Sequence, residues 1–417
     1  MGRLPFLIAG CALIIAFDFY CIRAILAISK NWSTKTKRRF KVLYLSSSFL
    51  LIAGVFAGIY LNIFLSLRSI ILVAFFLITA CKIVLLPFLL VDDLRRLLVR
   101  LYLALRNNKP GTTAEKPGAE PISRSEFIVK AGLVTAAIPL TSLTWGITSG
   151  AYDYQIRRQT LILPNLPAAF DGIIMGQISD IHSGSFYNKR AVKGGVDMLL
   201  GEKPDFIFFT GDIVNDMATE MRDYQDIFAK VKAPLGVYSS LGNHDYGDYH
   251  FGKDPSPEKA RNLRDVIKTH ELLGWDLLMN EHRRLKVNGE EIGIIGIENW
   301  GMGRFPKYGR MDLATKDTDD LPVKLLLSHD PSHWRQEVLT KYPQIDAMFS
   351  GHTHGMQFGV RTKDFQWSPI QYIYKEWAGL YQEQHQQLYV NVGYGFLGYP
   401  GRVGILPEIT IFTLKRA

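Results

Sequence analysis

The chain has 417 residues and a formal net charge of +9 at pH 7, but the charge is unevenly distributed. Residues 1–130 contain 18 Lys and Arg against 6 Asp and Glu, a net charge of +12, which leaves −3 for residues 131–417. Residues 131–417 therefore have no excess of basic side chains, and no nucleic-acid partner is expected. All three cysteines lie in the first third, which excludes a disulfide framework and a thiol nucleophile from the rest.

Three apolar segments are long enough to cross a bilayer, which takes about 20 residues. They run over residues 4–28, 42–64 and 69–91. A fourth segment, residues 127–149, is less apolar because it contains Lys130, Pro139 and several threonines. It is either a further span or a buried helix of the following domain. Because two strong spans follow the first, the region is predicted to be a polytopic anchor instead of a signal peptide.

Lys and Arg residues predict the orientation of these spans. Residues 30–41 contain six and residues 92–130 contain eight, whereas residues 65–68 contain one. The two basic loops are therefore expected in the cytoplasm. If the fourth segment also crosses, residues 152–417 lie outside the cytoplasm. Asp18 and Lys82 fall inside spans, where they form either a structural ion pair or part of an ion path.

The composition suggests four consecutive regions. Residues 1–106 hold the spans and a juxtamembrane amphipathic helix, and residues 107–122, rich in Pro and Gly, are expected to form a flexible linker. Residues 123–151 contain the fourth apolar segment. It opens on an export-like motif in which Ser125 stands where a twin-arginine signal has its second arginine. Residues 152–417 are predicted to form a separate α/β domain.

In this last region, short apolar runs alternate with polar or helical stretches, which is typical of buried strands in an α/β protein. Each run is rich in Ile, Val or Phe and is bounded by Gly or polar residues. The eight runs are residues 172–179, 205–210, 235–241, 292–297, 323–328, 346–350, 388–392 and 409–414.

Five of these runs end in clusters of His, Asp or Asn. They are Asp180-Ile181-His182, Gly211-Asp212, Gly242-Asn243-His244-Asp245, Ser328-His329-Asp330 and Gly351-His352-Thr353-His354-Gly355. Residues just past strand ends converge on one rim of a sheet. Strand alternation further predicts that residues two apart, such as Asp180 and His182, share one side. The clusters therefore predict a metal site.

The donor set combines carboxylates, an amide and imidazoles without a thiolate, which suits Mn, Fe or Zn, with Mg as a further candidate. It is larger than one ion needs, so two divalent cations sharing a bridge are expected. Five further histidines lie outside the clusters and are expected to be surface residues. His250 is the one exception for which another role is considered. They are His250, His270, His282, His333 and His385.

The ordered clusters resemble the signature of calcineurin-like metallophosphoesterases, over residues 161–414. The resemblance implies a four-layer αββα sandwich after the α-helical transmembrane region. It implies one metal held by Asp180, His182, Asp212 and His354, and a second held by Asp212, Asn243, His329 and His352. His244 would contact phosphate and protonate the leaving group. Water activated by two metals would then hydrolyse a phosphate ester.

The C-terminal segment, residues 393–410, is similar to a membrane-associated bacterial branch of the family, in which some enzymes cleave phosphodiesters or pyrophosphates, including lipid precursors. This implies a bacterial inner-membrane protein whose substrate is a phosphate ester, lipid-linked or soluble, with membrane lipid as a neighbour. A phosphomonoesterase, a nucleotide phosphodiesterase and a non-catalytic binding protein remain alternatives, and the oligomeric state stays open. Since Asn215 stands where many relatives have a carboxylate, Asp245 or Asp216 is expected to support His244.

Residues 356–381, between the last metal motif and the next strand, are rich in aromatic side chains. They include Phe358, Phe365, Trp367, Tyr372, Tyr374, Trp377 and Tyr381. Because the segment follows the metal ligands directly, it is expected either to form a wall of the pocket or to pack beneath its own loop. Met356 replaces a glycine that is frequent in the branch, and its side chain is expected to narrow the pocket.

Overall fold

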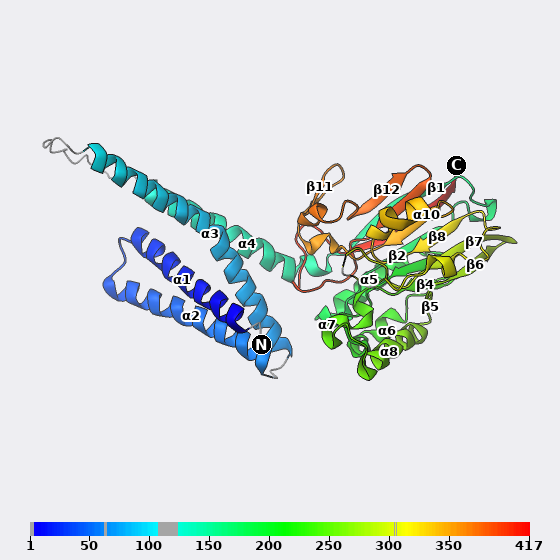
Figure 1. Cartoon of the computed structure of the whole chain (residues 1–417), viewed down its shortest axis with the longest axis horizontal. Coiled ribbons are helices and arrows are strands. Elements are labelled where there is room, and N and C mark those ends of the chain that lie inside the picture. The colour runs from blue at the N-terminus through cyan, green and yellow to red at the C-terminus, as the bar shows by residue number, and fades with distance from the viewer. Residues whose placement is uncertain (1–3, 62–64, 107–123, 304, 306) are drawn as a thin grey trace. The chain divides into compact units, whose positions relative to one another are not determined.

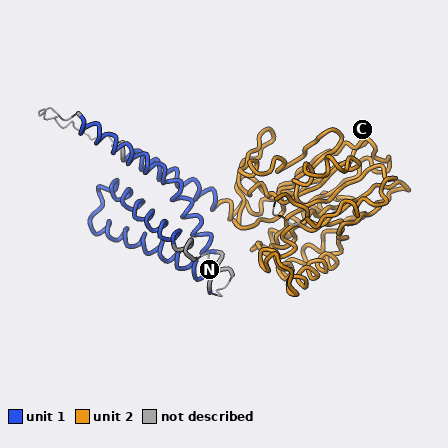
Figure 2. Tube along the Cα trace, viewed as in Figure 1, with its two compact units in different colours: residues 1–144 blue, residues 145–417 orange. Residues whose placement is uncertain are grey.

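The computed structural model describes residues 4–61, 65–106, 124–303, 305 and 307–417. They form two compact units, residues 1–144 and residues 145–417 (Figure 2). The predicted linker, residues 107–122, lies outside the described residues.

The first unit consists of long helices. They are α1 (Leu4–Ile28), α2 (Thr34–Tyr60), α3 (Leu65–Arg106) and α4 (Arg124–Thr148) (Figure 1). Among the described residues, four segments are long and apolar enough to cross a membrane: Ala9–Ile28, Thr34–Gly58, Ile70–Leu105 and Glu126–Tyr152. The three strong spans that the hydropathy predicted are therefore helices, and the chain is a membrane protein.

The fourth apolar segment also forms a helix with exposed apolar side chains. Phe127, Val134 and Ile138 on α4 are exposed by 65%, 71% and 61%. Side chains exposed in this way suit a helix that faces lipid. By length and composition, this segment is a fourth candidate span.

An ion pair lies among the first three helices. Lys82 on α3 pairs with Asp18 on α1, and the Lys82 ammonium donates a hydrogen bond to Ser48 Oγ on α2 at 3.0 Å. All three side chains are buried. The structural pairing of Asp18 and Lys82 is therefore confirmed, as an apolar environment requires of two charges.

The second unit contains two six-stranded sheets and a small hairpin. In spatial order, the first sheet comprises β1 (Gln155–Leu163), β14 (Glu408–Arg416), β2 (Ile174–Ile178), β3 (Phe206–Thr210), β4 (Val237–Ser240) and β5 (Asp276–Leu277). The second comprises β12 (Gly379–Glu383), β13 (Gln386–Val390), β9 (Ala347–Ser350), β8 (Lys324–Leu327), β7 (Glu290–Gly296) and β6 (Glu281–Val287). The hairpin pairs β10 (Val360–Arg361) with β11 (Gln366–Trp367).

Parallel pairing brings the carboxyl ends of the central strands together. In the first sheet β2, β3, β4 and β5 are parallel, and in the second β7, β8, β9 and β13 are parallel. All eight apolar runs in the sequence coincide with strands of these sheets. The strands β1, β5, β6 and β10 to β12 were not predicted, because they are short, polar or exposed edge strands.

The two sheets pack face to face. Phe208, Phe349 and Phe412 form edge-to-face pairs between them, with ring centroids 5.1 and 5.3 Å apart. Burying each such ring contributes about 1.5–3 kcal/mol to stability. These side chains hold the two strand-end rims next to each other, which is how loops from both sheets reach one site.

Helices cover the outer faces of both sheets. The first sheet packs against α5 (Lys189–Gly201), α6 (Gln225–Phe228) and α8 (Pro257–Leu273). The second packs against α9 (Met311–Ala314), η6 (Trp334–Val338) and α10 (Leu339–Lys341). The predicted four-layer αββα sandwich is thus confirmed, preceded by the helical membrane region. The remaining elements are η1 (Gly150–Tyr152), η2 (Ala168–Phe170), η3 (Ser183–Ser185), η4 (Ala218–Asp223), η5 (His244–Tyr246), α7 (Asp248–Phe251), η7 (His354–Gln357) and η8 (Pro369–Tyr372).

Candidate metal centre

The candidate site lies where β2, β3, β4, β8 and β9 end. Its donor residues sit in tight loops with unusual backbone angles: φ is +51° at Asp180, +47° at His182, +59° at Asp212, +72° at His352 and +51° at His354. Such conformations cost about 1–3 kcal/mol each, and they concentrate at functional sites. The surrounding structure therefore stabilises a strained arrangement that turns these side chains toward one another.

Two glycines allow the loops to approach closely. A Cβ at Gly242 would lie 2.2 Å from Asp212 Oδ1, and a Cβ at Gly351 would lie 2.0 Å from Asp180 Oδ2. Any side chain at either position would displace a carboxylate of the site. The glycines in the motifs are therefore a steric requirement of the donor arrangement.

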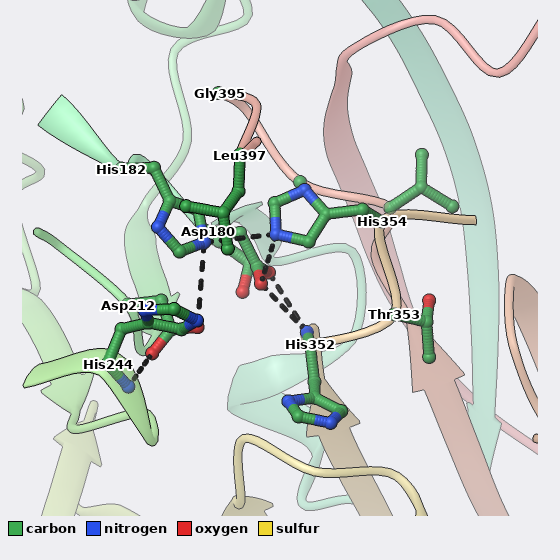
Figure 3. Close-up of polar contacts among 12 residues, drawn as sticks. Asp180, His182, Asp212, His244, His352, Thr353, His354, Gly395 and Leu397 are labelled. Atoms are coloured by element: carbon green, nitrogen blue, oxygen red, sulfur yellow. Dashed lines mark hydrogen bonds and ion pairs between the residues drawn. The ribbon is translucent and has the colours of Figure 1, made fainter. Parts of the chain in front are cut away.

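The first donor group contains Asp180, His182 and His354. His354 Nε2 lies 3.2 Å from Asp180 Oδ1 and 3.0 Å from His182 Nε2 (Figure 3). The sequence predicts that strand alternation places Asp180 and His182 on the same side. This mechanism is wrong, because neither residue lies in the strand. Both follow the end of β2 and reach the site through their left-handed backbone conformations.

The second donor group contains Asp212, His329 and His352. His329 Nε2 lies 3.1 Å from Asp212 Oδ2, and His352 Nδ1 lies 3.3 Å from His329 Nε2. Asn243 joins them, since its Oδ1 lies 2.8 Å from His352 Nδ1. The structure therefore places all seven predicted metal ligands around one centre, as two groups.

Asp212 lies between the two groups. Its Oδ2 is 3.1 Å from His329 Nε2 and 3.5 Å from His182 Nε2. Its Oδ1 accepts a hydrogen bond from the His244 backbone N–H at 2.8 Å (Figure 3). One carboxylate oxygen thus faces both groups while the other is held by the backbone, which is the geometry a bridging ligand needs.

The electrostatic environment of the site favours the binding of a cation. Burial alone would raise the pKa of Asp212, but the imidazoles of His329, His244 and His182 together outweigh burial and hold this pKa well below its usual range. Burial opposes protonation of His329, yet Asp212 and Asp180 raise its pKa to about 10. These buried carboxylates stay ionised and attract a cation, and burial lowers the pKa of His182, which keeps it in the neutral form that ligates metals.

His244 belongs to neither donor group. Its ring stacks on Tyr249, with centroids 4.5 Å apart, and meets the edge of His182 at 4.9 Å. Its Nδ1 lies 2.6 Å from the Asn215 carbonyl oxygen. A carbonyl only accepts hydrogen bonds, so Nδ1 carries a proton and donates it to Asn215.

Of the two carboxylates expected to support His244, Asp245 has a different role in the structure. Asp245 is fully buried, and its carboxylate accepts hydrogen bonds from the backbone N–H groups of Asp212, Ile213 and Gly242 at 2.8–2.9 Å. It therefore fixes the loop that carries Asp212, and it does not orient His244. A backbone carbonyl accepts the same hydrogen bond that a carboxylate would, so the Asn215 main chain supplies the partner of His244 Nδ1.

Residues outside the sequence motifs orient the histidine ligands. His329 Nδ1 lies 2.7 Å from the Thr210 carbonyl oxygen, which directs Nε2 into the site. His352 Nε2 contacts Tyr374 Oη at 2.8 Å, and Asp330 Oδ2 lies 3.4 Å from that hydroxyl. Tyr374 stood out in the sequence only as one of several aromatic residues, and Thr210 contributes a backbone atom that no sequence pattern reveals.

Arg402 is a further residue that the sequence did not indicate. It is fully buried beside His354, and its guanidinium donates hydrogen bonds to the carbonyl oxygens of Gly395 and Val392 at 2.6 and 2.7 Å. These bonds hold the loop after β13 against the first donor group. A single arginine in a loop has no sequence signal, so only the structure could find it.

The expectation that the remaining histidines are exposed is wrong for two of them. His270 and His333 are fully buried. His270 Nδ1 lies 3.0 Å from Ser239 Oγ, and His333 Nδ1 lies 3.0 Å from Ser328 Oγ. The tertiary packing decided their burial. His250 is exposed on α7 and lies outside both donor groups.

The aromatic segment divides between the two roles proposed for it. Tyr374 lines the pocket at the donor groups, whereas Trp377 is 3% exposed and packs in a small core with Ile370 and Ile405. Met356 is 46% exposed and does not line the pocket, so it does not narrow it. The wall of the pocket is therefore formed by η8 and its neighbours.

The pocket above the donor groups has a volume of about 400 Å³. Asp212, His352 and His354 contribute to its polar lining, together with His244 and Tyr249. Its apolar lining residues are Phe305, Ile370, Ile373 and Leu397. The pocket thus combines cation-binding donors with a surface for an apolar group.

An αββα sandwich with two adjacent nitrogen and oxygen donor groups defines a metal-dependent hydrolase. The family described as "Calcineurin-like phosphoesterase" matches residues 175–356, and the one described as "Probable Calcineurin-like phosphoesterase, transmembrane domain" matches residues 3–151. The chain belongs to the calcineurin-like metallophosphoesterases, which hydrolyse phosphoester bonds using divalent metals.

Similar proteins occur in both animals and bacteria. A "Transmembrane protein with metallophosphoesterase domain" from Danio rerio is 28% identical over 69% of this chain and 63% of its own length. The metallophosphoesterase YkuE of Bacillus subtilis is 30% identical over 60% of this chain and 82% of its own. A protein named UDP-2,3-diacylglucosamine pyrophosphatase LpxG, from Chlamydia trachomatis, is 26% identical over 63% of this chain and 90% of its own. The chain thus spans less than two thirds of the zebrafish relative's length.

Proposed function

We propose that this protein hydrolyses a phosphodiester or pyrophosphate that carries a bulky apolar group, as a lipid-linked substrate does. The observation that carries the proposal is the pocket, whose lining combines donor residues with the apolar side chains of Ile370, Ile373 and Leu397. The phosphate would bind over the donors while the apolar group contacts these apolar side chains. The pyrophosphatase name of the Chlamydia relative and the membrane helices of this chain support the same substrate class.

The two donor groups fit a pair of divalent cations, and we assign Mn, Fe or Zn, with Mg as a further candidate. Asp180, His182, Asp212 and His354 would hold one ion. Asp212, Asn243, His329 and His352 would hold the second. When bound, such a pair supplies positive charge for the phosphate oxygens and lowers the pKa of water.

The protein's own residues then orient and protonate the substrate. His244 is held by the Asn215 carbonyl oxygen through Nδ1, which leaves its Nε2 as the atom able to deliver a proton. Because His244 lines the pocket, we assign it as the general acid that protonates the departing oxygen. Asp245 is a positioning residue in this scheme, because it holds the Asp212 loop.

We place the catalytic domain, residues 152–417, on the extracytoplasmic side of a bacterial inner membrane. The support is the distribution of Lys and Arg between the loops, combined with four spans.

An activity screen of the purified full chain in detergent tests the proposal. Monoester, diester and pyrophosphate substrates, each in soluble and lipid-linked form, are compared after loading with Mn, Fe, Zn or Mg. We expect the lipid-linked diester or pyrophosphate to be cleaved fastest, and Asp180→Asn to abolish every activity. Preferential cleavage of soluble monoesters would refute the substrate class, and equal activity in Asp180→Asn would refute the site.

A further inference from the structure

Large apolar side chains gather on one exposed part of the second unit, which we name the apolar rim. Six side chains within 18 residues are exposed by 41–77%: Met356, Phe358, Val360, Phe365, Tyr372 and Ile373. Exposed apolar groups that cluster in this way mark an interaction surface, whereas isolated ones do not. The rim therefore requires a partner.

The rim is one continuous structure. Val360 pairs with Trp367 in the β10–β11 hairpin, which Ser368 follows directly. Ser368 Oγ donates a hydrogen bond to the Gly355 carbonyl oxygen at 2.7 Å, so the start and end of the segment are joined. Ile373 belongs both to the rim and to the apolar lining of the pocket. The exposed apolar surface thus leads into the candidate active site.

Hydrogen bonds within the second unit join the rim to residues 145–148. Residues 145–148, the last turn of α4, belong to the second unit. The Arg402 N–H donates to the Gly146 carbonyl oxygen at 3.1 Å, and the Gly359 N–H donates to the Val403 carbonyl oxygen at 2.9 Å. Phe358 also forms a β-bridge with Val403. One short loop therefore links the last turn of α4 to the rim.

Aromatic residues at this junction are those typical of a membrane–water interface. Trp145 is exposed by 48% and Tyr187 by 54%, and the Tyr187 hydroxyl donates to the Ile147 carbonyl oxygen at 2.5 Å. Trp and Tyr concentrate at the depth where a span leaves the bilayer. Since α4 lies in one of the four candidate spans, these side chains mark that depth on the second unit itself.

We propose that the apolar rim rests on the lipid surface from which α4 emerges, so that the pocket opens toward the membrane. The occupant is a bilayer, because hydrogen bonds within the second unit join the rim to residues 145–148, which lie in the fourth candidate span and include the exposed Trp145. Exposed Lys363 and Lys375 alternate with the apolar residues and suit anionic headgroups. The consequence for lipid-borne substrates rests on the proposed function, whereas the docking itself does not.

Lipid contact can be measured directly on the full chain in proteoliposomes. With the three native cysteines replaced by alanine, Tyr372→Cys or Phe365→Cys is labelled with a fluorophore and exposed to lipids bearing nitroxide groups. Leu272→Cys on α8 is the matched control, because Leu272 is 54% exposed in the same unit. We expect strong quenching at the two rim positions and little at Leu272. Equal quenching at all three positions would overturn the docking.

A second measurement separates the docking from the proposed function. In the Phe365→Ser/Tyr372→Ser double variant, the ratio of lipid-borne to soluble phosphodiester hydrolysis should fall about tenfold, because two apolar anchors are lost. Leu272→Ser should keep the ratio of the unmodified protein. Quenching without any phosphodiester activity would refute the proposed function and leave the docking standing. Activity without rim quenching, or rim-to-rim cross-linking between two copies, would refute the docking.

Discussion

Replacing His244 by Gln tests the assignment of the general acid most sharply. The backbone N–H of residue 244, which binds Asp212 Oδ1 at 2.8 Å, is unaffected by the substitution. The His244 ring is absent from both donor groups, so both metals should remain bound. Loss of a positioned proton donor slows turnover by about 10²–10⁴-fold. This corresponds to a barrier about 2.7–5.4 kcal/mol higher.

The assay compares phosphodiesters whose leaving groups differ in basicity. An alkoxide must be protonated as it leaves, whereas a nitrophenolate leaves without a proton, so the defect should be large for alkyl esters and small for nitrophenyl esters. Metal content, measured by mass spectrometry, should stay at the value of the unmodified protein. Leu272→Ser is the control, since Leu272 is 54% exposed on α8 and does not line the pocket. Loss of metal, or an equal defect for both esters, would refute the proton-donor role.

Three further predictions concern the bridge, acid stability and topology. Asp212→Asn should lose at least one metal and most activity, and full activity with unchanged metal content would contradict the bridge. Burial lowers the pKa of His270 to about 3. In the unfolded chain the pKa of His270 is about 6.5, so below this pH protons bind the unfolded state preferentially. The free energy of unfolding should therefore fall by about 2 kcal/mol between pH 7.5 and 5 because of His270. His270→Leu should abolish that part of the decline in thermal melts, and an unchanged decline would exclude His270 as its source. Protease added to spheroplasts should cleave residues 152–417, whereas protection until lysis would place them in the cytoplasm.

The sequence alone determined the features that depend on local patterns. Apolar runs identified the central strands and the spans, because a buried strand or a membrane helix needs continuous apolar side chains. The clusters at the strand ends identified seven donor residues, because parallel strands deliver their carboxyl ends to one edge. The donor types also indicated a metal, since burying carboxylates without a cation or a cationic partner is costly.

Only the tertiary structure decided which groups those residues contact. The left-handed backbone at Asp180 and His182, and not the strand alternation, turns both toward the site. The Asn215 carbonyl supports His244, and Asp245 binds the backbone instead, because hydrogen-bond partners depend on how loops from different strands meet. Tertiary contacts also bury His270 and join the apolar rim to residues 145–148. These properties come from contacts between residues distant in sequence, which no local pattern records.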